Sequence, residues 1–422
     1  MSPRTSKTTW PLPFAEPEDV GVSSERLARI RPHMDRFINS EMAPNFVTLM
    51  ARHGKVVHYD AQGYMDFASK KPAGLDTIYR LWSNTKPITG VATMICVEEG
   101  LLTLDDPVSK YIPAFKNQRV RMPAGQGPMT ASPTEPVARD ITVRDCLRNT
   151  TGLTTARQAP LSHLTEYKEA VSKAGLMSGG GAGGNLRERL NALAQLPLEC
   201  QPGTKFEYQV GYPIAGVVLE TVIGQTLQEF YSKRIFQPLG MKDSAFYLEK
   251  SKLTRFPTLY RPAQENGKWK LVVSEEPAKS EKVTGPRTYF EAGGGGGGVL
   301  STAADYARFA QMLLNKGELE GTRIISRKSW ELMTSSHTGA IDVMGRQGFG
   351  FGMGVGVYNG GGIPINRSVG TFGWGGAAGT MFFVDPKEDF FAICFSQVFM
   401  RQAMPGNTYE EDFERLTYES LL

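Results

Sequence analysis

The succession of strand and helix patterns along the 422 residues predicts an α+β fold, built from an α/β domain and an all-helical domain. Strand patterns occur near both ends of the chain, and the segment between them carries mainly helical patterns. The length also favours more than one structural unit. We therefore expect a discontinuous α/β domain (residues 1–100 and 245–422), a mostly helical domain (residues 101–244), and an active site in the cleft between them.

The first hundred residues begin the predicted α/β domain. Apolar residues at helical spacing predict a helix over residues 22–40, and two strand patterns over 46–63 predict a hairpin. A further strand is expected over 77–80. Apolar residues from Ile88 to Cys96 then recur on one helix face, and Gly100 supplies the glycine at which a helix commonly ends.

Helical patterns predominate between residues 101 and 244. We expect helices over residues 142–147, 166–174, 185–196 and 212–224. The glycine-rich run from Gly175 to Gly184 loses much conformational entropy when it is fixed, so we predict a mobile surface loop there.

Strand patterns return from residue 268 onward. Thr302 followed by Asp305 predicts a capping box at the start of another helix. Strands are expected over 349–358, 380–384 and 390–396, and a final helix over 409–421 would pack against their sheet.

Composition argues against several classes of function. The net charge is only +4, and no basic segment is interleaved with aromatic residues, so no nucleic-acid partner is expected. The four cysteines lie far apart and the five histidines lack ligand spacing, so we expect neither disulfides nor a metal or other cofactor. Because the N-terminus lacks a signal-peptide core and no apolar run reaches membrane length, we expect a cytoplasmic protein without a membrane partner.

The chemistry is organised around Ser83-Asn84-Thr85-Lys86, the one Ser-x-x-Lys string in the chain. Residues three apart on a helix share a face, with Cβ atoms roughly 5–6 Å apart. Pro87 lacks an N–H, so the helix must begin within about a turn before it, which places Ser83 near the positive end of the helix dipole. A lysine amine whose pKa is lowered by burial can accept the proton of a serine hydroxyl. Ser83 is therefore a candidate nucleophile and Lys86 a candidate base.

Two later stretches bear on this serine. Tyr208 follows a Pro-Gly turn and precedes a predicted helix, and a tyrosine beside a lysine can shuttle protons. Trp374-Gly375-Gly376-Ala377 precedes the strand at 380–384, where glycines let a substrate lie against the backbone and N–H groups can stabilise an oxyanion. Taken singly, each stretch also fits a structural role, as a packed aromatic residue or a bulged edge strand.

Together, the three stretches in this order resemble the serine β-lactamase/penicillin-binding-protein superfamily, in particular its class C β-lactamase-like esterases, the family VIII carboxylesterases. Segments at 100–107, 147–153, 238–241 and 384–386 extend the resemblance over most of the chain. The resemblance implies a β-lactamase/transpeptidase-like fold, an antiparallel sheet flanked by helices with an inserted helical domain. It also implies that Ser83 is acylated, that Lys86 and Tyr208 form the base system with either as proton acceptor, and that the N–H groups of Ser83 and Ala377 form the oxyanion hole.

Two positions depart from the β-lactamase patterns. Tyr-x-Asn reads Tyr208-Gln209-Val210, and Lys-Thr-Gly reads Trp374-Gly375-Gly376. These changes remove an amide suited to a β-lactam side chain and a cation suited to the lactam carboxylate. We expect Val210, Trp374, Gly375 and Gly376 to line a substrate site that favours neutral esters.

The sequence therefore predicts a serine carboxylesterase that hydrolyses small, short-acyl esters through an acyl-enzyme, with weak β-lactam hydrolysis as a side activity. Its predicted partner is a small-molecule ester. The alternatives are an acyltransferase that uses the same three side chains, a β-lactamase or D-amino-acid peptidase, and a non-enzymatic binding scaffold.

Overall fold

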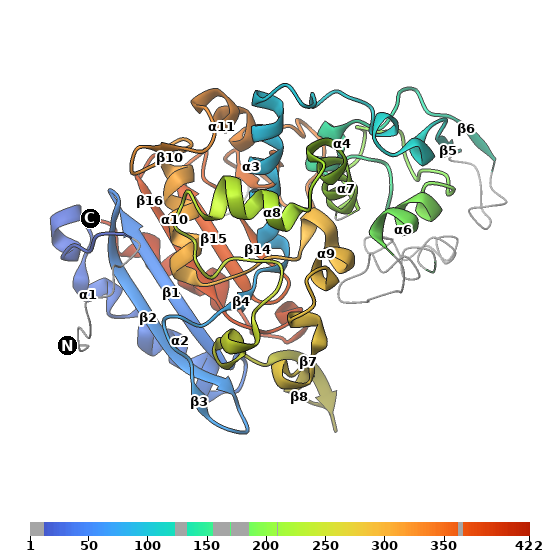
Figure 1. Cartoon of the computed structure of the whole chain (residues 1–422). Coiled ribbons are helices and arrows are strands. Elements are labelled where there is room, and N and C mark those ends of the chain that lie inside the picture. The colour runs from blue at the N-terminus through green and yellow to red at the C-terminus, as the bar shows by residue number, and fades with distance from the viewer. Residues whose placement is uncertain (1–11, 123–132, 155–168, 170–184, 209, 362–365) are drawn as a thin grey trace.

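An eight-stranded antiparallel sheet forms the centre of the computed structural model, which describes residues 12–122, 133–154, 169, 185–208, 210–361 and 366–422. The strand order is β12-β13-β14-β15-β16-β1-β2-β3. The strands are β1 (Asn45–Arg52), β2 (Lys55–Asp66), β3 (Lys71–Pro72), β12 (Phe349–Phe351), β13 (Gly356–Tyr358), β14 (Phe372–Gly376), β15 (Thr380–Asp385) and β16 (Phe390–Phe395). Because β1 pairs with β16, strands from the two ends of the chain lie side by side at the middle of the sheet (Figure 1).

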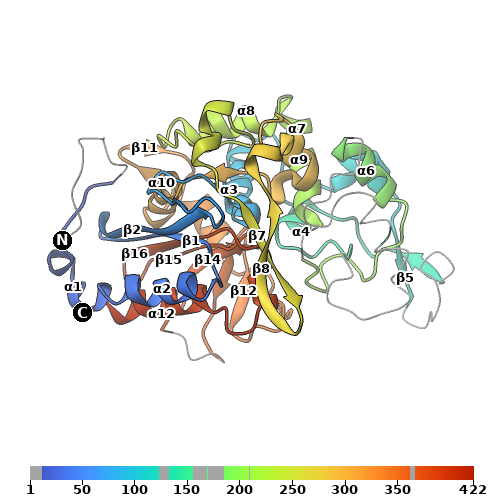
Figure 2. The same ribbon diagram turned by 90° about the horizontal axis from the view of Figure 1, so that it is seen from below.

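Helices cover both faces of this sheet, which gives three layers (Figure 2). One face carries α1 (Ser24–Leu27), α2 (Ile30–Asn39) and α12 (Tyr409–Glu419), and the other carries α3 (Thr85–Glu98) and α10 (Ala303–Leu314). In β16, Phe391, Ile393 and Phe395 join the core beneath α3 and α10, whereas the alternate residues join the core beneath α2 and α12. Since successive side chains of a strand point to opposite faces, two covered faces require the continuous apolar run seen in the sequence.

The remaining elements surround this sandwich. The helices are α4 (Val143–Leu147), α6 (Leu186–Leu193), α7 (Gly211–Ile223), α8 (Leu227–Tyr231), α9 (Thr288–Gly293) and α11 (Arg327–Thr334). Two-stranded pairs are formed by β4 (Tyr79–Arg80) with β9 (Leu300–Ser301), β5 (Arg119–Arg121) with β6 (Thr134–Pro136), β7 (Leu259–Glu265) with β8 (Lys268–Glu275), and β10 (Glu318–Leu319) with β11 (Thr322–Arg323). None of the helices in the described part of the chain combines the length and apolar character needed to cross a bilayer.

The antiparallel sheet flanked by helices is confirmed, and the early hairpin is present as β1 and β2. The helices expected over 142–147, over 212–224, after Thr302 and over 409–421 are also present, as α4, α7, α10 and α12. A single apolar core runs from the sheet into the segment that holds α4, α6 and α7, and the division into two domains with a cleft between them stays a prediction. The helix expected over 166–174 and the loop expected over 175–184 lie outside the described residues.

Three predicted elements differ in detail. The helix over 22–40 is interrupted between Leu27 and Ile30, and the expected strand over 349–358 is the hairpin β12–β13. Its turn forms because the Gly352 N–H donates to the Val355 carbonyl (2.8 Å) and Gly354 has a φ of +108°, a conformation that favours glycine. The capping box before α10 is half formed.

Thr302 caps α10 by accepting a hydrogen bond from the Asp305 N–H (3.1 Å). The Asp305 carboxylate instead accepts from the Asp243 N–H (2.7 Å) and the Ser244 hydroxyl (2.9 Å). A backbone N–H and a hydroxyl of a distant loop have therefore replaced the local donor that the sequence pattern predicts.

Candidate active site

Ser83 lies in a single 3₁₀ turn, Trp82–Asn84, immediately before α3, as the Pro87 argument predicts. The turn is held from two sides. The Leu81 N–H donates to the Val299 carbonyl (3.0 Å), and the Thr380 hydroxyl donates to the Leu81 carbonyl (3.0 Å). Trp82 has a φ of +46°, in the left-handed region that non-glycine residues seldom adopt. Such a conformation persists only where the surroundings determine it, so the serine is presented by a turn that cannot relax freely.

Lys86 occupies the first turn of α3, and its amine points at Ser83. The Nζ atom donates to Ser83 Oγ (3.0 Å) and to the Gly296 carbonyl (2.8 Å). The residue is 1% exposed, and Nζ lies 4.8 Å from the Tyr208 ring centroid and 5.2 Å from that of Tyr212. Burial lowers the pKa of the Lys86 amine from its ordinary value, and the neighbouring Tyr208 hydroxyl opposes this shift.

Tyr208 reaches the same serine from another part of the chain. Its hydroxyl donates to Ser83 Oγ (2.9 Å) and accepts a hydrogen bond from Trp374 Nε1 (2.7 Å). The extended segment that carries Tyr208 is bonded to residues 147–153, one of the segments that extend the family resemblance. The Glu207 N–H donates to the Asn149 carbonyl (2.7 Å). The structure thus brings Ser83, Lys86, Tyr208 and Trp374 into one hydrogen-bonded chain of side chains.

The Trp374 indole is oriented by its neighbours in the sheet. Its ring meets the Phe351 ring edge to face, with centroids 4.8 Å apart and an interplanar angle of 89°. A Cβ atom placed on Gly356 of the adjacent strand would lie 2.8 Å from the indole, so only glycine leaves room for the ring. These contacts aim Nε1 at the Tyr208 hydroxyl.

The glycine segment belongs to β14, which pairs with strands on both sides and is therefore not the edge strand of the sheet. Its partner β13 nevertheless pairs only with Phe372 and Gly373, so residues 374–376 extend beyond the paired part of β13. A Cβ atom on Gly376 would lie 2.2 Å from the Leu81 carbonyl oxygen, whereas one on Gly375 would meet no atom closer than 3.6 Å. Glycine at 376 thus lets β14 approach the turn that carries Ser83.

Ala377 and Val210 have different positions. Ala377 is half-buried directly after β14; its carbonyl accepts from the Met400 N–H (2.8 Å), and its own N–H has no acceptor among the described residues. Val210 lies at the start of α7 and is 1% exposed within the apolar core. It offers almost no surface to a bound molecule, and its contact with substrate stays a prediction.

Comparison with known proteins gives this arrangement a context. The model of the Beta-lactamase family matches residues 32–412. The chain belongs to the Beta-lactamase family. The resemblance inferred from the motifs is thereby confirmed, and with esterases among its relatives this chain is a serine hydrolase of the carboxylesterase type.

Three similar proteins show how far the similarity extends. Protein Rv1367c of Mycobacterium tuberculosis is 31% identical over 404 residues, covering 89% of this chain and 94% of that protein. Esterase EstB of Burkholderia gladioli is 28% identical over 372 residues, covering 85% and 87%. The structure of EstCE1, a hydrolase with promiscuous acyltransferase activity, has a TM-score of 0.74 at 24% identity over 93% of this chain and 98% of that one. EstCE1 and this chain share the β-lactamase/transpeptidase-like fold.

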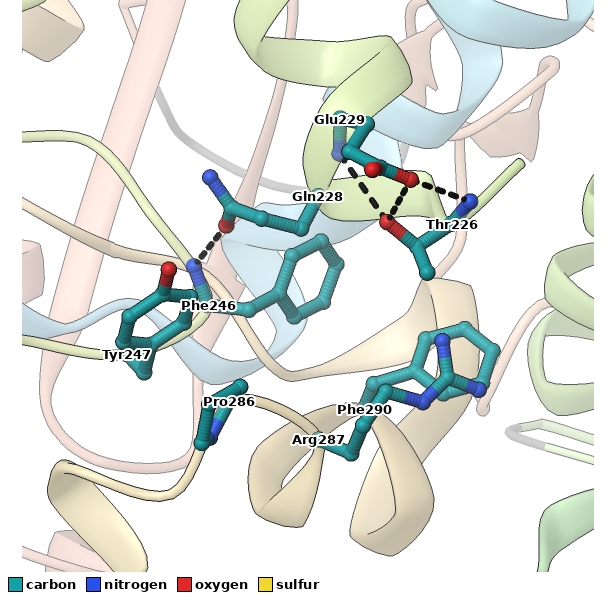
Figure 3. A pocket seen from close by; sticks show the side chains of 8 residues that line it. All are labelled: Thr226, Gln228, Glu229, Phe246, Tyr247, Pro286, Arg287 and Phe290. Atoms are coloured by element: carbon teal, nitrogen blue, oxygen red, sulfur yellow. Dashed lines mark hydrogen bonds between the residues drawn. The ribbon is translucent and has the colours of Figure 1, made fainter.

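A cavity of about 230 Å³ lies apart from this Beta-lactamase-family site, between α8 and α9 (Figure 3). Three of the polar side chains that line it have partners within the protein. Gln228 Oε1 accepts from the Phe246 N–H (2.7 Å), Glu229 caps α8 with Thr226, and Arg287 pairs with Glu220 (2.7 Å). The two charged side chains that line the cavity are therefore already neutralised or bonded by neighbouring protein groups.

Sequence reasoning missed two groups that hold the site together. The Gly296 carbonyl, which accepts from Lys86, lies within the run of six glycines from Gly293 to Gly298, which carries no side-chain motif. Thr380 bonds both to the Leu81 carbonyl and to Asn84 Nδ2 (3.2 Å), which ties β15 to the serine turn. The glycine run was a detectable signal, whereas nothing local marks Thr380.

Proposed function

We propose that this chain is a serine carboxylesterase that hydrolyses small, short-acyl esters through an acyl-enzyme on Ser83. The observation that carries the proposal is the convergence of two proton-bearing groups on one hydroxyl, with Lys86 Nζ at 3.0 Å and the Tyr208 hydroxyl at 2.9 Å from Ser83 Oγ. Both distances are within the range required for proton transfer to or from a nucleophile.

Acylation begins when Ser83 Oγ attacks the ester carbonyl and loses its proton to the Lys86–Tyr208 pair. Neutral amine is required for Lys86 to accept this proton, and burial favours the neutral form. Tyr208 lies beside the same oxygen and is oriented by Trp374, so it can pass a proton to the departing alkoxide. The ester C–O bond breaks, the alcohol leaves with that proton, and the acyl group remains on Ser83.

Water completes the cycle. The same pair removes a proton from a water molecule as it attacks the acyl carbonyl, and Ser83 recovers its proton when the acid leaves. In both halves the carbonyl oxygen becomes negative. The backbone N–H groups of Ser83 and Ala377 are the proposed donors to it, and the Ala377 N–H has no acceptor among the described residues.

Acyl transfer is the second candidate, because EstCE1 is described as a hydrolase with promiscuous acyltransferase activity. An alcohol or amine would then replace water in the second half of the cycle. Hydrolysis of β-lactams is expected to be weak, since Trp374 occupies the position of the lysine in the β-lactamase pattern. A β-lactamase or peptidase is therefore the third candidate, and a non-enzymatic scaffold would have no need for Ser83, Lys86 and Tyr208 to meet.

The test compares p-nitrophenyl butyrate with a chromogenic cephalosporin in the wild type, Ser83→Ala, and the control Ser24→Ala, which removes an exposed serine in α1. We expect rapid cleavage of the ester, slow cleavage of the cephalosporin, and loss of both by at least about 10³-fold in Ser83→Ala alone. A fluorophosphonate should label the wild type and the control but not Ser83→Ala. Retention of esterase activity by Ser83→Ala would refute the proposal, and a preference for the cephalosporin would favour the third candidate.

A further inference from the structure

Arg346 places a cation beside the proposed active site. It lies in the connection between α11 and β12, with its guanidinium carbon 5.9 Å from the centroid of the Trp374 ring. The face of an indole attracts a cation at this distance. Trp374 in turn donates to Tyr208, whose hydroxyl contacts Ser83, so two aromatic side chains connect Arg346 to the reacting serine.

The turn that carries Arg346 is well fixed although its side chain is exposed. The Gly345 N–H donates to the Asp342 carboxylate (2.8 Å), the Arg346 N–H to the Val343 carbonyl (3.2 Å), and the Phe349 N–H to the Arg346 carbonyl (3.2 Å). Val343 is buried in the core. The backbone therefore holds Arg346, an exposed residue, over the indole.

Arg346 has no hydrogen bond or ion pair from its side chain within the described residues, although other arginines near it do. Arg367 pairs with Glu414, and Arg401 pairs with Glu410 (2.8 Å) and Glu411 (3.0 Å). The surrounding protein and the like charge of Arg367 lower the pKa of Arg346, while Glu410 and Glu411 oppose this. An ordinary arginine pKa is so far above neutrality that the guanidinium stays charged.

We propose that Arg346 binds a carboxylate of the substrate, so that the preferred esters are monoanions that carry a free carboxylate besides the reacting ester. This inference rests on the proposed function and changes its substrate class, because replacement of the family's lysine by Trp374 alone favours neutral esters. A guanidinium offers two parallel N–H donors to a carboxylate, and the indole face restricts its motion. The anion-binding cation would thus come from the turn that carries Arg346, instead of from the position in β14 that Trp374 occupies.

The carboxylate can belong to the acyl part or to the alcohol part, and two matched pairs of esters distinguish these cases. For the acyl part, monomethyl glutarate is compared with dimethyl glutarate. For the alcohol part, butyryloxyacetate is compared with its methyl ester, and release of butyrate is followed. Within each pair only one carboxylate is masked, so the ratio of kcat/KM for the charged and neutral members measures anion recognition.

Arg346→Gln should lower this ratio by about tenfold in at least one pair, mainly through a higher KM for the charged ester, and Arg346→Lys should retain part of it. Added salt should lower the wild-type ratio and leave that of Arg346→Gln nearly unchanged. The control is Arg29→Gln, which removes the same charge from an arginine that pairs with Glu25 near the N-terminus. This variant should keep the wild-type ratio.

An unchanged ratio in both pairs, or equal losses on charged and neutral esters, would overturn the proposal, because Arg346 would then only support Trp374. Failure of the proposed function is a separate outcome, since it would appear as retained hydrolysis of the neutral esters by Ser83→Ala. The pairs also identify which part of the substrate carries the charge, according to which ratio responds to Arg346→Gln.

Discussion

The two sides of Ser83 differ in how they are built. On the α3 side, Lys86 is buried and bonded to the Gly296 carbonyl, and Thr380 fixes the adjoining turn through Leu81. On the β14 side, Tyr208 and Trp374 are half-buried aromatic residues. On the α3 side, hydrogen bonds to backbone carbonyls hold the groups in place, and glycine leaves room for them. On the β14 side, aromatic rings that pack against one another hold the groups in place.

This difference separates two tasks. Proton transfer requires an amine at fixed distance and with an altered pKa, which a buried lysine with backbone partners provides. Substrate choice requires surface that a ligand can touch, and the exposed Arg346 and the half-buried Trp374 and Gly375 provide such surface. Changes to Lys86 and its backbone partners should therefore affect kcat for every substrate, whereas changes to Arg346 should depend on the substrate.

The largest effect that tests this contrast is expected from Gly296→Ala. Its Cβ would lie 2.9 Å from Tyr212 Cβ, so the backbone must shift and carry the acceptor of Lys86 away. A misplacement of about 1 Å can cost roughly 10²-fold, and we expect kcat to fall by about that factor for both p-nitrophenyl butyrate and a longer ester.

Gly293→Ala is the matched control in the same glycine run, because a Cβ there meets no atom within 4 Å. It should keep the wild-type kcat. Overpacking at 296 should also lower the free energy of unfolding by about 1–3 kcal/mol, measured by urea titration. Equal kcat values for the two variants would show that the glycine run does not position Lys86.

A smaller effect is expected on the other side, from Trp374→Phe. Loss of the indole donor to Tyr208 should lower kcat by about tenfold in the wild-type background. In a Tyr208→Phe background that hydrogen bond is already absent, so the same change should cost much less. Trp269→Phe, at an exposed tryptophan of β8, controls for loss of an indole. If Trp374→Phe lowered kcat by the same factor in the wild-type and Tyr208→Phe backgrounds, Trp374 would act independently of Tyr208.

The smallest effect is a displacement along the pH axis. The rate of labelling by a fluorophosphonate should rise with pH as the Lys86 amine becomes neutral, with an apparent pKa below the usual lysine value of about 10.4. Since the Tyr208 hydroxyl raises the pKa of Lys86, Tyr208→Phe should move the profile to lower pH while reducing its height. A shift to higher pH would show that the two groups are not coupled in this sense.

Local patterns predicted most of the fold and the first half of the site. Ser83 and Lys86 were placed together because residues three apart on a helix share a face, and the early hairpin followed from alternation around Gly54. The hairpin β12–β13 was missed because a run of strand-forming residues obscured the turn at Gly352 and Gly354.

Contacts made across the fold could not be predicted in the same way. The Gly296 carbonyl has no side chain to reveal it, and the aim of the Trp374 indole depends on Phe351 and Gly356 in neighbouring strands. Arg346 lies in a turn without periodicity, so only its position over the indole distinguishes it from other surface arginines. Tyr208 was found from the order of motifs rather than from any local signal.

The pairing of β1 with β16 has a consequence for folding on the ribosome. Val47 of β1 can pair with Phe395 of β16 only after Phe395 has been synthesised. Until then, the β1 edge of the early hairpin has no strand paired with it. The turn that presents Ser83 depends in the same way on Val299 and Thr380. A nascent chain therefore carries its nucleophile for most of synthesis without the geometry to use it, and the exposed edge of β1 makes that interval the one in which chaperones matter most.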